Sequence, residues 1–99
     1  MRVVARSTLR TFWEQLGRED AEQPLRAWFA EAKNADWRTP ADIKARYRNA
    51  SILKRGRVVF NVGGNKYRLV VAVKYSAHLV FIRFVGTHQA YDRINANEV

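Results

Sequence analysis

The sequence predicts one α+β domain spanning residues 1–99, in which a helical hairpin packs on one face of a small antiparallel sheet. Two observations carry this prediction. Between residues 9 and 32, apolar residues recur at the spacing found on one face of an amphipathic helix. Between residues 57 and 94, three apolar runs rich in Val, Phe, Ile and Tyr are separated by turn residues, which is typical of a three-stranded meander.

The amino-terminal part predicts a short edge strand followed by two helices. Residues 2–6 are compatible with the strand, and Ser7 can cap a helix that runs to Leu16 and stops at Gly17. The second helix is expected to begin near Asp20, with Pro24 in its first turn. The two apolar stripes are Leu9, Phe12, Trp13, Leu16 and Leu25, Trp28, Phe29, Ala32. We expect these stripes to cover the sheet, so their tryptophans receive no functional role.

A third, short helix and a basic connection precede the first long strand. Thr39 is the expected cap, Pro40 the first helical residue, and Asp42 the acid of a capping box. Residues 48–57 then form the connection, and the three strands are expected at Val58–Val62, Tyr67–Tyr75 and Leu79–Val85.

Alternation along the meander assigns its residues to two faces. With hairpin turns of two or four residues, even positions of the first and third strands share a face with odd positions of the second. The face that the helices should cover is apolar except for one tyrosine hydroxyl. It consists of Val58, Phe60, Val62, Tyr67, Leu69, Val71, Val73, Val80, Ile82 and Phe84.

The opposite face of the meander is half polar and cationic. Its apolar floor carries Arg57, Asn61, Lys66, Arg68 and Arg83. Lysine and arginine side chains at such positions commonly reach solvent without binding anything, but their clustering on one face favours a polyanion. The residues predicted to bind nucleic acid, on this face and in the basic approach to it, are Lys54, Arg55, Arg57, Arg83 and Lys74.

The distribution of charge points in the same direction. The net charge is +9, and no acidic residue lies between Ile43 and Tyr91, a stretch with ten lysines and arginines. Such asymmetry indicates nucleic acid, or an acidic protein partner that masks the same surface. A membrane partner is disfavoured because the basic residues do not follow an amphipathic helix.

Composition excludes several classes of site. The chain has no cysteine and only two histidines, which excludes thiolate chemistry and an ordinary zinc site. Paired carboxylates are missing from the expected sheet, which disfavours a two-metal nuclease. No run of about 18 apolar residues and no apolar secretory signal occur, so a cytoplasmic location is expected.

The remaining polar residues can support RNA cleavage without a metal or cofactor. RNA supplies its own nucleophile, the 2′-OH, and the site must move two protons and stabilise a phosphorane. Thr87 can cap a helical turn that places His88 and Tyr91 on one side; Tyr91 could instead stack on a base. The catalytic candidates are Arg68, His88, Tyr91, Lys66 and Asn61. The last residues, 95–99, are expected to be frayed.

Two stretches resemble the HigB toxins of bacterial type II toxin–antitoxin systems, in the wider RelE/ParE-like group. They are residues 60–70, FNVGGNKYRLV, and residues 80–92, VFIRFVGTHQAYD. The turn WRTP at residues 37–40 and the following ADIK are also similar to this family. The resemblance covers the chain from about Trp28 to Ile94.

The resemblance implies a RelE-like fold and an endoribonuclease that enters the ribosomal A site and cuts mRNA without metal. It also implies a HigA-like helix-turn-helix antitoxin. The toxin would then contact operator DNA only indirectly, through this antitoxin. Arg68 matches the strand arginine that contacts the scissile phosphate, and His88 and Tyr91 match carboxyl-terminal residues tied to catalysis. RelE itself has a more basic carboxyl-terminal motif than residues 87–89, so the acid and base remain unassigned. The group also contains gyrase inhibitors, so a non-catalytic basic module that binds RNA or protein through the same face is the alternative.

Overall fold

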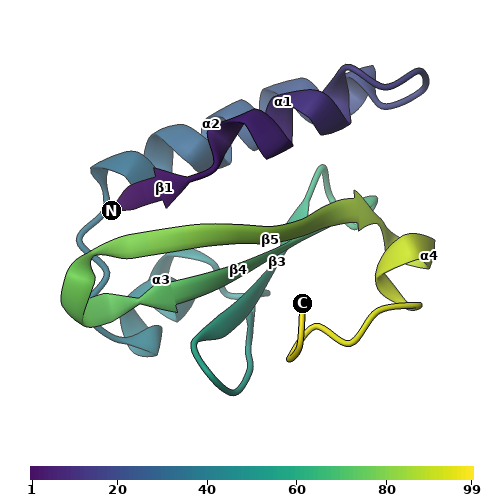
Figure 1. Ribbon diagram of the computed structural model, residues 1–99. Coiled ribbons are helices and arrows are strands. Elements are labelled where there is room, and N and C mark those ends of the chain that lie inside the picture. Colours follow the sequence, from purple (N-terminus) through teal and green to yellow (C-terminus); the bar gives the residue numbers. More distant parts are fainter.

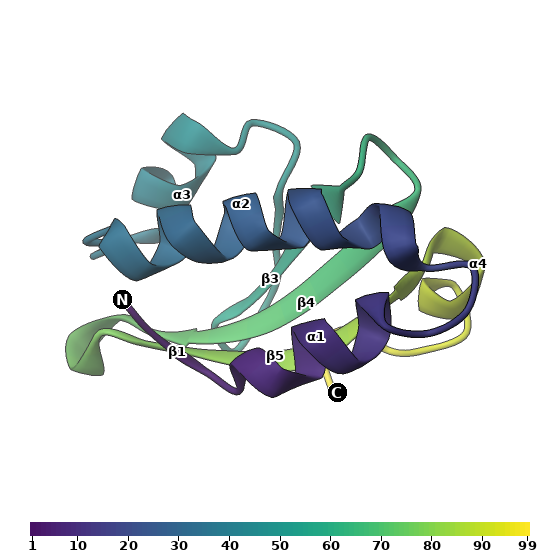
Figure 2. The same cartoon turned by 90° about the horizontal axis from the view of Figure 1, so that it is seen from above.

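Helices cover one side of a five-stranded sheet, and the end of the chain lies on the other side (Figure 1). The computed structural model describes residues 1–99. Helices α1 (Arg6–Trp13) and α2 (Glu22–Asn34) form a hairpin joined through a short 3-10 turn, η1 (Glu19–Ala21), and they lie side by side over the sheet (Figure 2). The predicted α+β class is therefore confirmed. We call the face of the sheet away from α1 and α2 the outer face.

The sheet is mixed. Its strands are β1 (Arg2–Val4), β2 (Ser51–Ile52), β3 (Arg57–Val62), β4 (Tyr67–Lys74) and β5 (Leu79–Thr87), in the spatial order β1-β5-β4-β3-β2. The predicted antiparallel meander is β3-β4-β5. The expected edge strand β1 pairs in parallel with β5, and β2 is a short additional strand in the stretch that we expected to be only a connection.

The helix ends follow local chemistry that the sequence shows only in part. Helix α1 begins one residue before Ser7, whose side chain does not cap it, and ends at Trp13. The chain then turns at Gly17 (φ +83°), which leaves Leu16 96% exposed. Helix α2 begins after η1 and keeps Pro24 in its first turn.

The short third helix, α3 (Pro40–Arg46), is built as predicted. The hydroxyl of Thr39 accepts a hydrogen bond from the backbone N–H of Asp42, and the Asp42 carboxylate accepts one from the N–H of Thr39 at 3.1 Å. This is the predicted capping box, in which two amide groups that lack helical partners are satisfied reciprocally.

No helix in the structure has the length and apolar character that a membrane span requires.

Aromatic rings and aliphatic side chains fill the space between the helices and the sheet. The ring of Phe60 on β3 lies 5.5 Å from that of Trp28, 6.0 Å from that of Trp37 and 4.9 Å from that of Tyr47. Leu25 of α2 is fully buried in the same core. The apolar stripe of α2 therefore covers the sheet as predicted.

Leu25→Ala is expected to lower the free energy of unfolding by about 2–5 kcal/mol, because it leaves a cavity where a fully buried side chain was. Leu16→Ala is the matched control: the same atoms are removed from a side chain that is 96% exposed. The control should change stability by less than about 0.5 kcal/mol. Chemical denaturation of both variants checks the prediction, and equal effects would show that α2 does not anchor the core.

A β-bulge in the meander makes the face assignments of Phe84 and Val85 wrong. Val71 pairs with Ile82, but its neighbour Val70 pairs with Phe84, so Arg83 is an extra residue on β5. One inserted residue reverses the side-chain alternation beyond it. Phe84 consequently packs on the outer face, where it was not expected, and Val85 packs against the main core instead.

The end of the chain covers part of the outer face, so the prediction of a frayed tail is also wrong. We call residues Asn95–Val99 the carboxyl-terminal segment. Ala96 is only 7% exposed and lies in a small second core with Val59 and Val70 of the outer face. Phe84 packs against this second core. The apolar strip on the outer face thus has a cover, supplied by the segment and by the short helix α4 (His88–Tyr91) before it.

Candidate functional site

A row of residues crosses one end of the outer face. Asn61 of β3 pairs with Arg68 of β4, and Arg68 pairs with Gly86 of β5. Gly86 must lack a side chain, because a Cβ atom there would approach the ring of Phe84 to 2.6 Å. The row therefore carries an amide and a guanidinium, and the ring of Phe84 lies against Gly86 at its other end.

The guanidinium of Arg68 is held by backbone oxygens. Its Nη1 donates to the carbonyl of Asn65 at 2.9 Å and to that of Tyr67 at 3.3 Å. The side chain is half-buried, and no carboxylate forms an ion pair with it. These contacts fix the position of the group without neutralising its charge, so it is preorganised to bind an anion.

Helix α4 brings His88 to the same end of the sheet. The hydroxyl of Thr87 accepts from the N–H of Ala90 at 3.1 Å, as predicted for a cap. The N–H of His88 donates to the carbonyl of Lys66 at 3.2 Å, which ties the start of α4 to the start of β4, two residues from Arg68. Tyr91, at the end of α4, packs against the second core.

Asp92 is a functional candidate that sequence reasoning left without a role. Its Oδ2 lies 3.3 Å from Nδ1 of His88. This contact orients the imidazole and leaves Nε2 as the ring nitrogen available for proton transfer. The signal in the sequence was the spacing of four residues between His88 and Asp92, which places both side chains on one side of a helical turn.

Lys66 is not brought to this row. Its ammonium pairs with the carboxylate of Asp20, which lies in η1 of the helical layer, and the buried hydroxyl of Tyr67 donates to the same carboxylate. The hydrogen bond from Lys66, followed by that from Tyr67, holds the pKa of Asp20 below its ordinary value. Because this contact occupies the ammonium, the geometry gives no support to the catalytic role predicted for Lys66.

Asp20→Asn is expected to lower the melting temperature slightly at pH 7, because the exposed pair with Lys66 is lost. The pKa of Asp20 is lowered on folding, so its stabilisation is present above the unfolded pKa of about 3.9 and is lost as pH falls through the folded value. The difference between wild type and variant should therefore shrink below about pH 4. Melting curves across this range check the sign, and a difference that grows in acid would contradict it.

The residues predicted to bind nucleic acid lie apart from the row. Lys54 and Arg55 are in the turn before β3, and Lys74 ends β4, six residues from Arg68 or roughly 20 Å along the strand. Arg57 and Arg83 lie between, and the Nε of each donates to the backbone oxygen of Val99, at 3.0 and 3.1 Å. The outer face is thus cationic at both ends, with the carboxyl-terminal segment over its middle.

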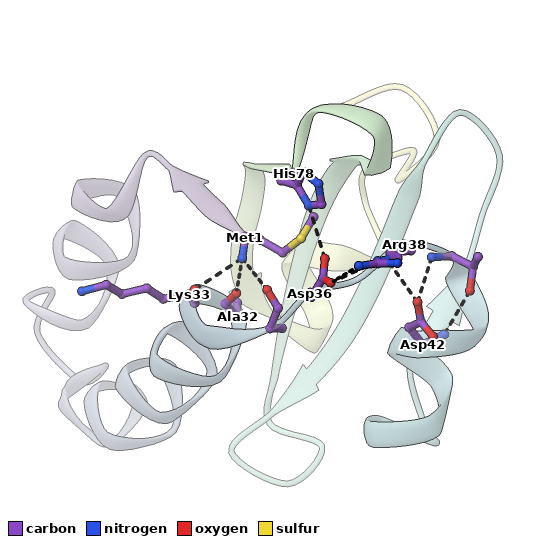
Figure 3. A network of polar contacts seen from close by, with 9 residues as sticks. Met1, Ala32, Lys33, Asp36, Arg38, Asp42 and His78 are labelled. Atoms are coloured by element: carbon purple, nitrogen blue, oxygen red, sulfur yellow. Dashed lines mark hydrogen bonds and ion pairs between the residues drawn. The ribbon is translucent and has the colours of Figure 1, made fainter.

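A second histidine makes a similar contact elsewhere. Nδ1 of His78 lies 3.4 Å from Oδ1 of Asp36, which also pairs with Arg38 (Figure 3). In the same region, the ammonium of Met1 donates to the carbonyls of Ala32, Lys33 and Ala35, which anchors the first residue to the end of α2. His78 therefore serves as an internal reference for a histidine–carboxylate contact outside the row of Asn61 and Arg68.

Comparison with known proteins assigns the chain to a family. No curated protein matches the chain. Residues 21–94 match the family model described as HigB toxin, the RelE-like toxic component of a toxin–antitoxin system. This match covers α2, α3, the meander, α4 and therefore every residue of the row, and it confirms the resemblance seen in the sequence. The chain belongs to the HigB family, whose members are the RelE-like toxic components of toxin–antitoxin systems.

Proposed function

We propose that this toxin is an endoribonuclease that cleaves mRNA on translating ribosomes in the cytoplasm and is neutralised by a HigA-like helix-turn-helix antitoxin. The observation that carries the proposal is the convergence of Asn61, Arg68 and His88 at one end of the outer face. A guanidinium without a carboxylate partner and an imidazole at the same end of the face supply both requirements of RNA cleavage, which are charge stabilisation and proton transfer.

The reaction follows from the chemistry of RNA. The 2′-oxygen attacks the adjacent phosphorus, the bond from phosphorus to the 5′-oxygen breaks, and the products carry a 2′,3′-cyclic phosphate and a 5′-hydroxyl. Arg68 binds the non-bridging oxygens and stabilises their charge in the phosphorane. Asn61, its neighbour on β3, can hydrogen-bond the same group. The reaction needs no metal ion, because the nucleophile is internal and the stabilising charge comes from Arg68.

His88 moves a proton through Nε2, and Asp92 acts as a positioning residue through its contact with Nδ1. Tyr91 is either the second proton-transfer group or a platform for a base. Its contact with the second core holds its ring in place for either role.

The side chains of four cations of the interface form neither an ion pair with an acidic side chain nor a hydrogen bond to the carboxyl-terminal segment, so they are free to follow the RNA backbone: Lys54, Arg55, Arg68 and Lys74. Binding to ribosomes should therefore weaken as salt rises, with a slope of log K against log salt of roughly −3 for four phosphate contacts. Lys74→Ala should reduce the magnitude of this slope by about 0.7. Lys33→Ala, at an exposed position of α2, should not change it. Co-sedimentation with ribosomes at several salt concentrations measures both. An affinity that barely responds to salt would contradict a polyanion-binding face.

The alternative is a toxin that binds RNA or a protein through the same face without cleaving. Induction of the toxin without any antitoxin, followed by mapping of mRNA ends, separates the two. Growth arrest with cuts in phase with codons supports the endoribonuclease. Growth arrest with intact mRNA would overturn it and favour the non-catalytic module.

A further inference from the structure

Two arginines of the outer face share one oxygen of the carboxyl-terminal segment. Nε of Arg57 and Nε of Arg83 lie 3.0 and 3.1 Å from the backbone oxygen of Val99. Arg57 is on β3 and Arg83 on β5, the two strands that flank β4, so the two guanidinium groups converge above β4. Two positive charges thus meet at a single acceptor.

We propose that Arg57 and Arg83 form a second phosphodiester-binding site for RNA, and that the carboxyl-terminal segment occupies this site until RNA displaces it. The proposal rests on the proposed function and adds a regulated RNA contact to it. A phosphodiester presents two anionic oxygens in the geometry that guanidinium groups bind best. It can therefore engage both arginines at once and compete with the Val99 oxygen for this pair.

The segment is held by few contacts and can leave without opening the main core. Of its five residues only Ala96 is buried; it and the half-buried Val99 pack on the outer face, on the side of the sheet opposite the helices (Figure 1). The side-chain oxygen of Asn97 accepts from the N–H of Lys54 at 3.3 Å. The remaining backbone bonds of the segment run within it, from Glu98 and Val99 to the carbonyl of Asn95. Segments with so few buried contacts open at low free-energy cost.

The bulge on β5 gives this site its position. Arg83 is the unpaired residue of the bulge, and bulges redirect side chains from the regular strand direction. Arg57 pairs with Ala72, four residues from Arg68 or roughly 13 Å along β4. An RNA strand on Arg68 can therefore continue along β4 to the arginine pair and on towards Lys74. Displacement of the segment would also uncover Phe84, a ring on which a base can stack.

The test measures binding of a single-stranded RNA oligonucleotide made uncleavable by 2′-O-methyl groups, using fluorescence anisotropy at several salt concentrations. Ala96→Gln is neutral and too large for its buried place, so it releases the segment while both arginines remain. It should tighten binding and steepen the slope of log K against log salt by about 1.4, which corresponds to two added phosphate contacts on a single strand. Ala41→Gln, the same change at an exposed position of α3, should leave both values unchanged.

The same measurement in a background of Arg57→Gln and Arg83→Gln assigns the gain to these residues. There, Ala96→Gln should neither tighten binding nor steepen the slope. A gain that persists without the arginines, or no gain with them when hydrogen exchange shows the segment released, would overturn the proposal. If Ala96→Gln fails to fold, deletion of residues 95–99 takes its place. Because the oligonucleotide cannot be cut, this result is independent of cleavage: intact mRNA in cells would overturn only the proposed function.

Discussion

Arg68→Ala is expected to slow mRNA cleavage by about 10²–10³ and to abolish toxicity. Removing one preorganised electrostatic contact to a developing charge costs a rate factor of this size. The fold should survive, because the Arg68 side chain bonds only to the carbonyls of Asn65 in the exposed turn and Tyr67 at the start of β4, and has no buried charge as a partner. Cleavage by the purified variant on ribosomes, together with its melting temperature, measures both effects.

Arg10→Ala is the matched control for this change. Arg10 is also an arginine without a carboxylate partner, but it lies exposed on α1, on the helical side of the sheet. The control should cut mRNA at the wild-type rate. Full activity in a folded Arg68→Ala variant would refute the assignment of the row as the active site.

His88→Asn should slow cleavage by about 10²–10⁴, the usual contribution of a positioned proton-transfer group. His78→Asn is an unusually close control. Both imidazoles are about half exposed, and each places Nδ1 within 3.4 Å of an aspartate oxygen. Asparagine also suits the left-handed backbone of His78 (φ 55°). If only the row at the end of the sheet is catalytic, the His78 variant should be fully active.

Tyr91→Phe completes this comparison because it keeps the ring and removes only the hydroxyl. A rate loss similar to that of His88→Asn would make Tyr91 the second proton-transfer group. Wild-type activity would make it a base platform. Equal rates in the two histidine variants, with both folded, would contradict the role of His88 in the mechanism.

The sequence predicted the positions of those candidate site residues that depend only on the pairing of neighbouring strands. Alternation placed Asn61 beside Arg68, and the short link after β5 brought His88 to the same end, since both depend only on neighbouring strands. The contact between Lys66 and Asp20 joins residues 46 positions apart in different layers. No local pattern encodes such a contact, so the helical partner of Lys66 could not be predicted.

The errors in the face assignment share one cause on β5. Face parity assumes one residue per position, and nothing in the run from Leu79 to Val85 marks Arg83 as the inserted residue. The bulge moved Phe84 to the outer face, where it enlarged an apolar strip that Ala96 helps to cover. The carboxyl-terminal segment packs on this strip through Ala96. Its own polar sequence, Asn95–Val99, predicted a frayed end because its burial depends on tertiary contacts.

The central claim, that the 2′-OH of ribosome-bound mRNA is the nucleophile, has a direct test. Two mRNAs that differ by one 2′-deoxy substitution at the cut nucleotide are loaded on ribosomes and incubated with the toxin. The account predicts that the ribose mRNA is cut to a 2′,3′-cyclic phosphate and a 5′-hydroxyl, while the deoxy mRNA binds equally well and stays intact. Cleavage of both mRNAs at the same rate would contradict it.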